Sequence, residues 1–114
     1  MEKKIPTVGN LNELDKLEEY LEWHGYFYER QDRKATVWAP GFEQHQIVVY
    51  NPLTLEREWD AVCHRGSYGF TEGLLEIAGT IIQPEDGDSV VGWQTAEDII
   101  KRLESQAGGG SAAR

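Results

Sequence analysis

Residues 46–64 read QIVVYNPLTLEREWDAVCH, and this stretch decides the fold. Its first five residues are rich in β-branched side chains, and residues 58–64 alternate between apolar and polar side chains, so each part is typical of a β-strand. The segment between them opens with Asn51 and Pro52, which favour a turn. We therefore predict an antiparallel hairpin at the centre of the chain.

The second strand of this hairpin has two chemically different faces. Alternation puts three of its less polar side chains on one face: Trp59, Ala61 and Cys63. It puts His64 on the opposite face, where an imidazole cannot readily activate the Cys63 thiol as a nucleophile. We therefore interpret Cys63 as a buried structural thiol.

Helical patterns lie on both sides of the hairpin. Leucines at spacings of three and four predict an amphipathic helix over residues 11–24, which Gly25 would end. A second helix is predicted between Ser67, as its cap, and Gly79. A third would begin at Thr95. The apolar stripe that supports the second helix consists of Phe70, Leu74 and Ile77.

Shorter strand candidates complete the expected fold. They cover residues 26–30, 35–39 and 89–93. The predicted order is α-β-β-β-β-α-β-α, which corresponds to a single α+β domain with a small antiparallel sheet and about three helices. This domain would occupy residues 1–106. Residues 107–114 have the composition of a flexible linker.

Composition excludes several kinds of protein. The 114 residues include 11 Lys and Arg against 20 Asp and Glu, for a net charge of −9. This charge argues against direct nucleic-acid binding through phosphate attraction and against docking on an anionic membrane. One cysteine excludes an internal disulfide framework, and no apolar run has the length of a signal peptide core or a membrane span. We therefore expect a cytoplasmic protein.

The excess negative charge lies toward the two ends of the chain. Residues 1–27 carry three lysines against six acidic side chains, and residues 67–114 carry three basic against eight acidic side chains. These acids either form solvated helix faces or form a surface that engages a basic partner. In the second interpretation, the partner-binding residues are Glu18, Glu19 and Glu22.

The segment HRGSYG, residues 64–69, joins a predicted strand to a predicted helix. Backbone N–H groups at the start of that helix would hold a phosphate or carboxylate. The candidate ligand-binding residues are His64, Arg65, Ser67 and Tyr68. The alternative is an ordinary capped turn, since the segment lacks the Gly-Lys-Ser/Thr ending of a Walker loop.

Catalytic and metal-binding patterns are weak throughout the sequence. No His or Cys spacing matches a known metal site, and Asp86-Gly87-Asp88 lacks the ligand ladder of a calcium loop. We therefore assign no catalytic residue, no metal and no cofactor. The four tryptophans divide between the core and an exposed contact patch of one or two. They are Trp23, Trp38, Trp59 and Trp93.

Several segments resemble small proteins encoded by phages and prophages of Gram-positive bacteria. The similar segments are residues 46–50, 59–63, 66–69, 72–76 and 92–100. The resemblance covers residues 10–104 and implies a setting, but it carries over no activity and no catalytic residue.

These observations favour a phage-type accessory protein that acts by binding another protein with a basic surface. One version is an inhibitor of a nucleic-acid-handling host enzyme, in which carboxylates replace backbone phosphates in a basic groove. The alternative is a small anion- or nucleotide-binding domain, or an enzyme, that uses the turn from Arg65 to Ser67. A structural role as an oligomer-forming component also remains open, because the sequence specifies neither the partner nor the oligomeric state.

Overall fold

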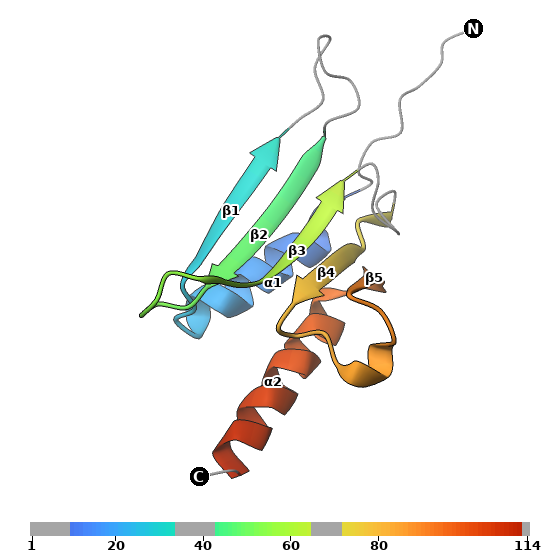
Figure 1. Ribbon diagram of the computed structural model, residues 1–114. Coiled ribbons are helices and arrows are strands. Elements are labelled where there is room, and N and C mark those ends of the chain that lie inside the picture. The colour runs from blue at the N-terminus through green and yellow to red at the C-terminus, as the bar shows by residue number, and fades with distance from the viewer. Residues whose placement is uncertain (1–9, 34–42, 65–71, 113–114) are drawn as a thin grey trace, which may run out of the picture.

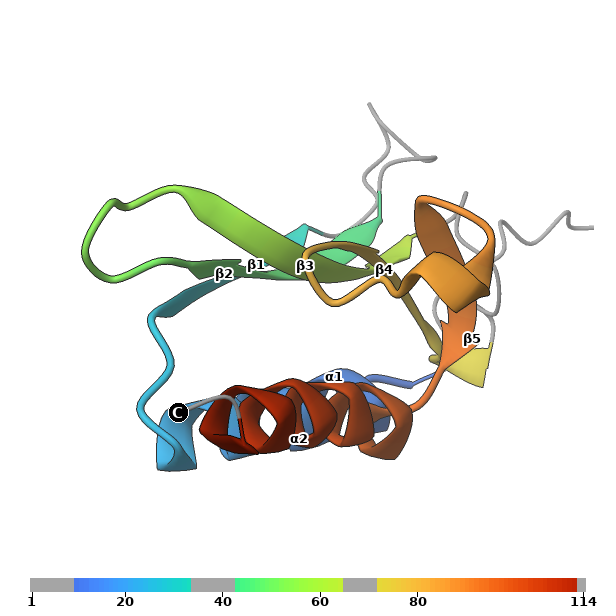
Figure 2. The same ribbon diagram turned by 60° about the horizontal axis from the view of Figure 1, so that its bottom comes forward.

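Five strands form one antiparallel sheet, and both helices lie on the same face of it (Figures 1 and 2). The computed structural model describes residues 10–33, 43–64 and 72–112, with backbone alone from residue 107. The elements follow one another as α1 (Asn12–Trp23), β1 (Tyr28–Arg33), β2 (Gln44–Tyr50), β3 (Arg57–His64), β4 (Leu75–Gly79), a short 3-10 helix η2 (Pro84–Asp86), β5 (Val90–Gln94) and α2 (Ala96–Ala112). The predicted α+β class and antiparallel sheet are confirmed.

Each strand of the sheet pairs with the next strand in the chain, in the order β1-β2-β3-β4-β5. The predicted central hairpin is formed by β2 and β3, with Ile47 opposite Ala61 and Val49 opposite Trp59. Its turn is held by the Asn51 side chain, whose oxygen accepts hydrogen bonds from the backbone N–H groups of Leu53 and Thr54. Local pairing of neighbouring strands therefore builds the whole sheet.

The ends of both helices follow the signals in the sequence. Asn10 accepts a hydrogen bond from the backbone N–H of Asn12 at the start of α1. Gly25 follows the helix with a φ of +73°, as a helix stop requires. At α2, the Thr95 hydroxyl accepts from the N–H of Asp98, while the Asp98 carboxylate accepts from the N–H of Thr95. This reciprocal arrangement is a capping box.

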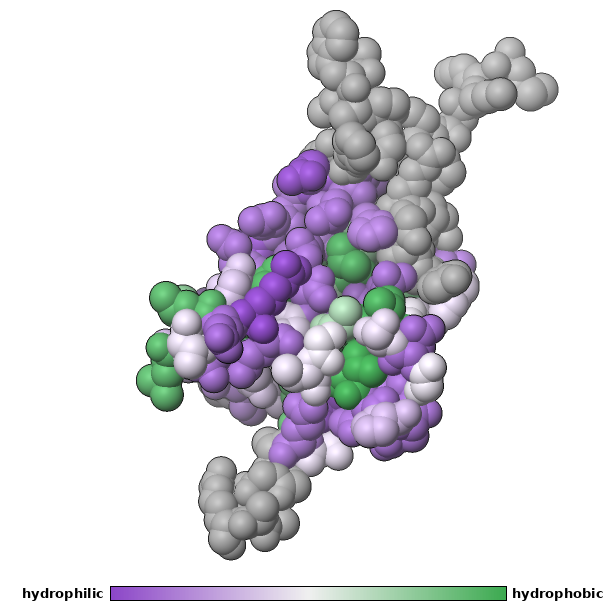
Figure 3. Space-filling view, viewed as in Figure 1, coloured by the Kyte–Doolittle hydropathy of each residue, from purple (hydrophilic) through white to green (hydrophobic). Residues whose placement is uncertain are grey.

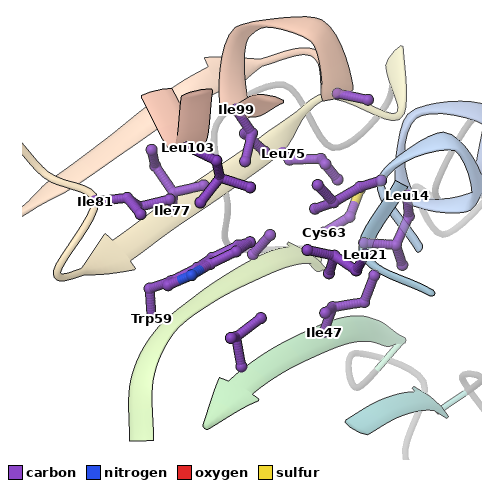
Figure 4. Close-up of a cluster of buried hydrophobic side chains, with 14 residues drawn as sticks. Leu14, Leu21, Ile47, Trp59, Cys63, Leu75, Ile77, Ile81, Ile99 and Leu103 are labelled. Carbon is purple, nitrogen blue, oxygen red and sulfur yellow. The ribbon is translucent and has the colours of Figure 1, made fainter. Parts of the chain in front are cut away.

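The core lies between the helices and the covered face of the sheet (Figure 4). It contains three leucines of α1, alternate residues of β2, β3 and β4, and apolar side chains of α2. Those labelled in Figure 4 are Leu14, Leu21, Ile47, Trp59, Cys63, Leu75, Ile77, Ile81, Ile99 and Leu103. Burial, together with the negative charge of Glu43, raises the pKa of the Cys63 thiol to about 11. Trp59, Ala61 and Cys63 share one face, as the alternation predicted, and all three are buried, which confirms the predicted burial of Cys63.

The predicted second helix is wrong over its described part. Residues Leu75–Gly79 form strand β4, so the described residues contain two α-helices where the sequence predicted about three. Leu75 and Ile77 are buried while Glu76 and Ala78 between them are only partly buried, which is the period-two pattern of a strand. β4 pairs with β3 on one side and β5 on the other, so backbone pairing outweighs the helical spacing of the side chains. Apart from the strand candidate at residues 35–39, the rest of the predicted order matches the described elements.

Two further predictions concern segments next to the ends of the described ranges. The weak strand candidate at residues 35–39 lies outside the described residues. The backbone of α2 is helical as far as Ala112, so its last turns enter the glycine-rich segment that follows residue 106. Among the helices of the described chain, none has the length and apolar character needed to cross a membrane.

Candidate functional site

The structure places only one residue of the predicted anion site. His64 ends β3 opposite Gln44 and lies on the sheet face away from the helices, as the alternation predicted. Arg65, Ser67 and Tyr68 lie outside the described residues. The anion-binding turn therefore stays a prediction from sequence.

Glu18, the first of the three predicted partner-binding acids, is held inside the fold. Its carboxylate accepts hydrogen bonds from Arg30 at 2.8 Å and from the Tyr28 hydroxyl at 3.0 Å. Burial and this hydrogen bond raise the pKa of Tyr28 to about 12. The same guanidinium also binds Asp15 at 2.8 Å and Asp32 at 3.1 Å. Glu18 thus joins α1 to β1 and is not available in the way a free surface acid is.

His45 extends this polar network to β2. Its side chain is almost fully buried, with Nδ1 2.7 Å from Asp32 and Nε2 2.9 Å from Glu43. Each ring nitrogen therefore lies within hydrogen-bond distance of a carboxylate. Burial would raise the pKa of Asp32, but hydrogen bonds from His45 and Arg30 outweigh it and lower that pKa. The network links α1, β1 and β2 through side-chain hydrogen bonds.

Glu19 and Glu22, by contrast, are exposed on the second half of α1. Neither forms an ion pair with any of the residues that the structure describes. Both precede Trp23 within the last helical turn or the one before, and the Trp23 side chain is 86% exposed at the end of the helix. A large aromatic side chain beside two uncompensated carboxylates has the composition of a protein-binding surface.

An open groove of about 580 Å³ lies beside this helix end, and we call it the aromatic groove. Its walls come from the segment after α1, from the β2–β3 hairpin and from α2. The residues that define it are Tyr20, His24, Tyr26, Phe27, Tyr50, Glu58 and Glu104. Two smaller hollows continue it, one sharing Tyr20 and His24 and reaching Trp23, the other sharing Phe27 and Tyr50 and reaching Leu55. The three form one band around this end of the molecule.

Large apolar side chains project beside the aromatic groove. Phe27 is 48% exposed, Leu53 91% and Leu55 64%. Figure 3 shows green side chains at the tip of the β2–β3 hairpin, on the left of the view. Leu55 has a φ of +64°, a left-handed conformation that costs a non-glycine residue roughly 1 kcal/mol. A leucine that is both strained and exposed points to a role in binding rather than in stability.

Two glutamates bring negative charge to the lining of the aromatic groove. Burial and then the charges of Glu104 and Glu58 raise the pKa of Tyr26, because a phenolate beside carboxylates is disfavoured. Burial, Tyr26 and Glu104 raise the pKa of Tyr20 in the same way. The Glu104 carboxylate forms no hydrogen bond or ion pair with the described part of the chain. A ligand that brings positive charge would therefore be favoured here.

The acids of the Asp86-Gly87-Asp88 segment have structural partners. The two oxygens of Asp86 accept hydrogen bonds from both terminal nitrogens of Arg102, at 2.8 and 3.0 Å, and its carboxylate also accepts from the backbone N–H of Gln83. These bonds lower the pKa of Asp86 to about 2. In the described ranges, 10–33, 43–64 and 72–112, no cluster of three His, Cys, Asp or Glu side chains can hold a metal ion.

We expect Asp86→Asn to destabilise the protein at neutral pH but not in strong acid. The folded pKa lies below the ordinary value of 3.8, so the stabilisation is complete above about pH 4 and is lost as the pH falls through about 2. Urea unfolding at about pH 7 should give a lower midpoint for Asp86→Asn than for the parent protein. The difference between the two midpoints should disappear toward about pH 2. Glu85→Gln, an exposed acid of the same turn, should leave the midpoint unchanged. A gap that persists in acid would contradict this assignment.

The sequence does not predict the aromatic groove. Its residues lie at positions 20–27, 50–58 and 104, and no periodicity links segments so far apart in the chain. The one signal in the sequence is the number of tryptophans, which indicates that some of them are exposed. In the structure Trp59 is in the core, whereas Trp23 and Trp93 are exposed. Trp38 lies outside the described residues. The expected division of the tryptophans between core and surface is confirmed for the three that are described.

Comparison of the chain with protein-family models, with curated proteins and with solved structures finds no match. The resemblance to small phage proteins therefore stays an expectation from the sequence. The fold and the surfaces described above are the basis for any functional assignment.

Proposed function

We propose that this protein is a cytoplasmic, phage-type accessory protein that acts by binding another protein with a basic surface. The observation that carries the proposal is the cluster of Glu19, Glu22 and Trp23 at the end of α1. Two carboxylates that form no ion pair with the described residues supply long-range attraction, and the exposed indole supplies apolar contact area. The sequence contains one cysteine, Cys63, and its burial in the core is in keeping with a reducing compartment.

In its narrower form, the proposal makes the partner a nucleic-acid-handling enzyme. Its basic groove would accept the carboxylates of this protein in place of backbone phosphates. A net charge of −9 on 114 residues supports this form, because such a surface repels nucleic acid and attracts the proteins that bind it. Duplex DNA should then compete with this protein for the partner.

The test is capture of partners by the tagged full-length chain from a bacterial lysate, at low and high salt. We expect a specific partner that salt releases and that the double variant Glu19→Lys, Glu22→Lys fails to capture. Reversing two charges at an interface rim should weaken binding by about tenfold or more. Binding that is insensitive to salt would contradict the electrostatic proposal.

A matched control separates local charge from net charge. The double variant Glu85→Lys, Glu97→Lys changes the net charge by the same amount at two other exposed positions, on η2 and at the start of α2. It should retain the partner. Loss of capture in both double variants would show that only net charge matters, and the assignment to Glu19 and Glu22 would then be wrong. Circular dichroism spectra of both variants should match that of the parent.

A further inference from the structure

The aromatic groove contains paired rings and carboxylates but little positive charge. The rings of Tyr20 and Tyr26 are 6.3 Å apart, and those of Phe27 and Tyr50 are 6.1 Å apart. His24 stacks beside Tyr20, with ring centroids at 4.1 Å. Among the described residues that line the groove and the two hollows that continue it, Lys16 is the one lysine or arginine, and its Nζ lies 3.8 Å from the Glu13 carboxylate. The groove thus presents aromatic faces together with unneutralised acids.

Aromatic faces and carboxylates together recognise cations. A cation over an aromatic face is attracted by the ring quadrupole, and the attraction grows when the site excludes water. Arginine suits such a site better than lysine, because its planar guanidinium stacks on rings and binds a carboxylate through two N–H groups. Glu104 is exposed and Glu58 is partly buried, so the two acids offer acceptors at different depths in the groove.

We propose that the aromatic groove binds an arginine side chain carried by a short apolar segment of the partner protein. The arginine would lie against the rings of Tyr26 and Phe27 with Glu104 as its counter-charge. The apolar neighbours of that arginine would contact Leu55 on one side and Trp23 on the other, since the two smaller hollows continue the groove in both directions. This inference rests on the proposed function, because it names the chemistry of the partner.

Charge complementarity selects this occupant over the other candidates. A second copy of the chain would bring its own net charge of −9 to an acidic surface, so self-association through this face is opposed. Free arginine would leave the two hollows that continue the groove empty. The apolar neighbours of an arginine within a peptide fill them and add contact area.

The experiment uses three capped tripeptides that differ only at the central residue. Their sequences are leucine-arginine-leucine, leucine-citrulline-leucine and leucine-lysine-leucine, each acetylated and amidated. Titration into the ¹⁵N-labelled full-length protein, followed by NMR, should shift the backbone amides of Gly25, Tyr26, Phe27 and Glu104 with the arginine peptide. Citrulline has nearly the same shape without the charge, so its peptide should bind about tenfold more weakly. Equal affinity for these two peptides, or shifts only outside the groove, would overturn the proposal.

Two variants on the same helix test the role of the carboxylate. Glu104→Gln should weaken binding of the arginine peptide by about fivefold and leave the affinity for the citrulline peptide unchanged. Glu97→Gln removes the same charge from an exposed position of α2 outside the groove, and it should leave both affinities unchanged. Equal loss in the two variants would overturn the assignment of Glu104. Neither position is buried, so both variants should fold.

The outcomes distinguish this proposal from the proposed function. If a salt-sensitive partner is lost with Glu19→Lys, Glu22→Lys but the groove does not prefer arginine over citrulline, the proposed function stands and the groove proposal fails. If the groove prefers arginine but no salt-sensitive partner is captured, the arginine specificity of the groove stands and the proposed function fails.

Discussion

Replacing Gly73 with alanine is expected to lower the free energy of unfolding by about 3 kcal/mol. Gly73 has a φ of +76°, which disfavours any side chain. A β-carbon at this position would overlap the backbone carbonyl oxygen of Asn10 and lie 2.8 Å from the oxygen of its side chain. Backbone atoms cannot move aside as a flexible side chain can, so either the start of β4 or the segment before α1 must shift. Urea unfolding followed by tryptophan fluorescence measures the loss.

Gly87→Ala is the matched control for this prediction. Gly87 has a φ of +71°, almost the same as Gly73, but nothing lies within 4 Å of a β-carbon built there. Gly87→Ala should therefore lower the free energy of unfolding only by the cost of a left-handed backbone conformation, roughly 1 kcal/mol. The difference between the two variants isolates the close approach of Gly73 to Asn10. Equal losses would mean that this contact contributes nothing to stability.

Replacing Arg30 with methionine is expected to cost about 3 kcal/mol at neutral pH. The guanidinium is only 14% exposed and binds Asp15, Glu18 and Asp32. Methionine retains the apolar part of the side chain and removes the charge, which leaves these acids close together without a cation. This loss of stability is measured as a lower urea midpoint and a lower thermal midpoint of unfolding. Arg57→Met, at a largely exposed arginine with Asp60 as its partner, should cost less than about 0.5 kcal/mol.

Acid provides a second readout for Arg30. Hydrogen bonds from His45 and Arg30 lower the pKa of Asp32, so this stabilisation is present above the unfolded pKa and is lost as the pH falls through the folded one. The gap between the parent and Arg30→Met should therefore narrow below about pH 4. A loss that is constant with pH would indicate lost packing rather than lost charge pairing.

Two aspects of the fold could be predicted because they depend on short stretches of chain. The hairpin of β2 and β3 follows from alternation around a turn, and α1 follows from leucine spacing between Asn10 and Gly25. The segment ending at Gly79 could not be assigned in the same way. Phe70, Leu74 and Ile77 have helical spacing, whereas Leu75 and Ile77 have strand spacing, and a short apolar run satisfies both. The free edge of β3 decides between them, because pairing with β4 satisfies its backbone groups.

The candidate site, like the fold, could be predicted only where it depends on a short stretch of chain. Sequence alone determined that α1 carries Glu18, Glu19 and Glu22 beside Trp23, because one helix displays nearby residues at fixed angles. Only the tertiary structure decided that Glu18 pairs with Arg30 while Glu19 and Glu22 stay free of ion pairs in the described chain. It alone brought Tyr26, Tyr50 and Glu104 together. Local spacing is set by covalent geometry and hydrogen bonding within one element, whereas the meeting of distant residues depends on how buried surfaces pack.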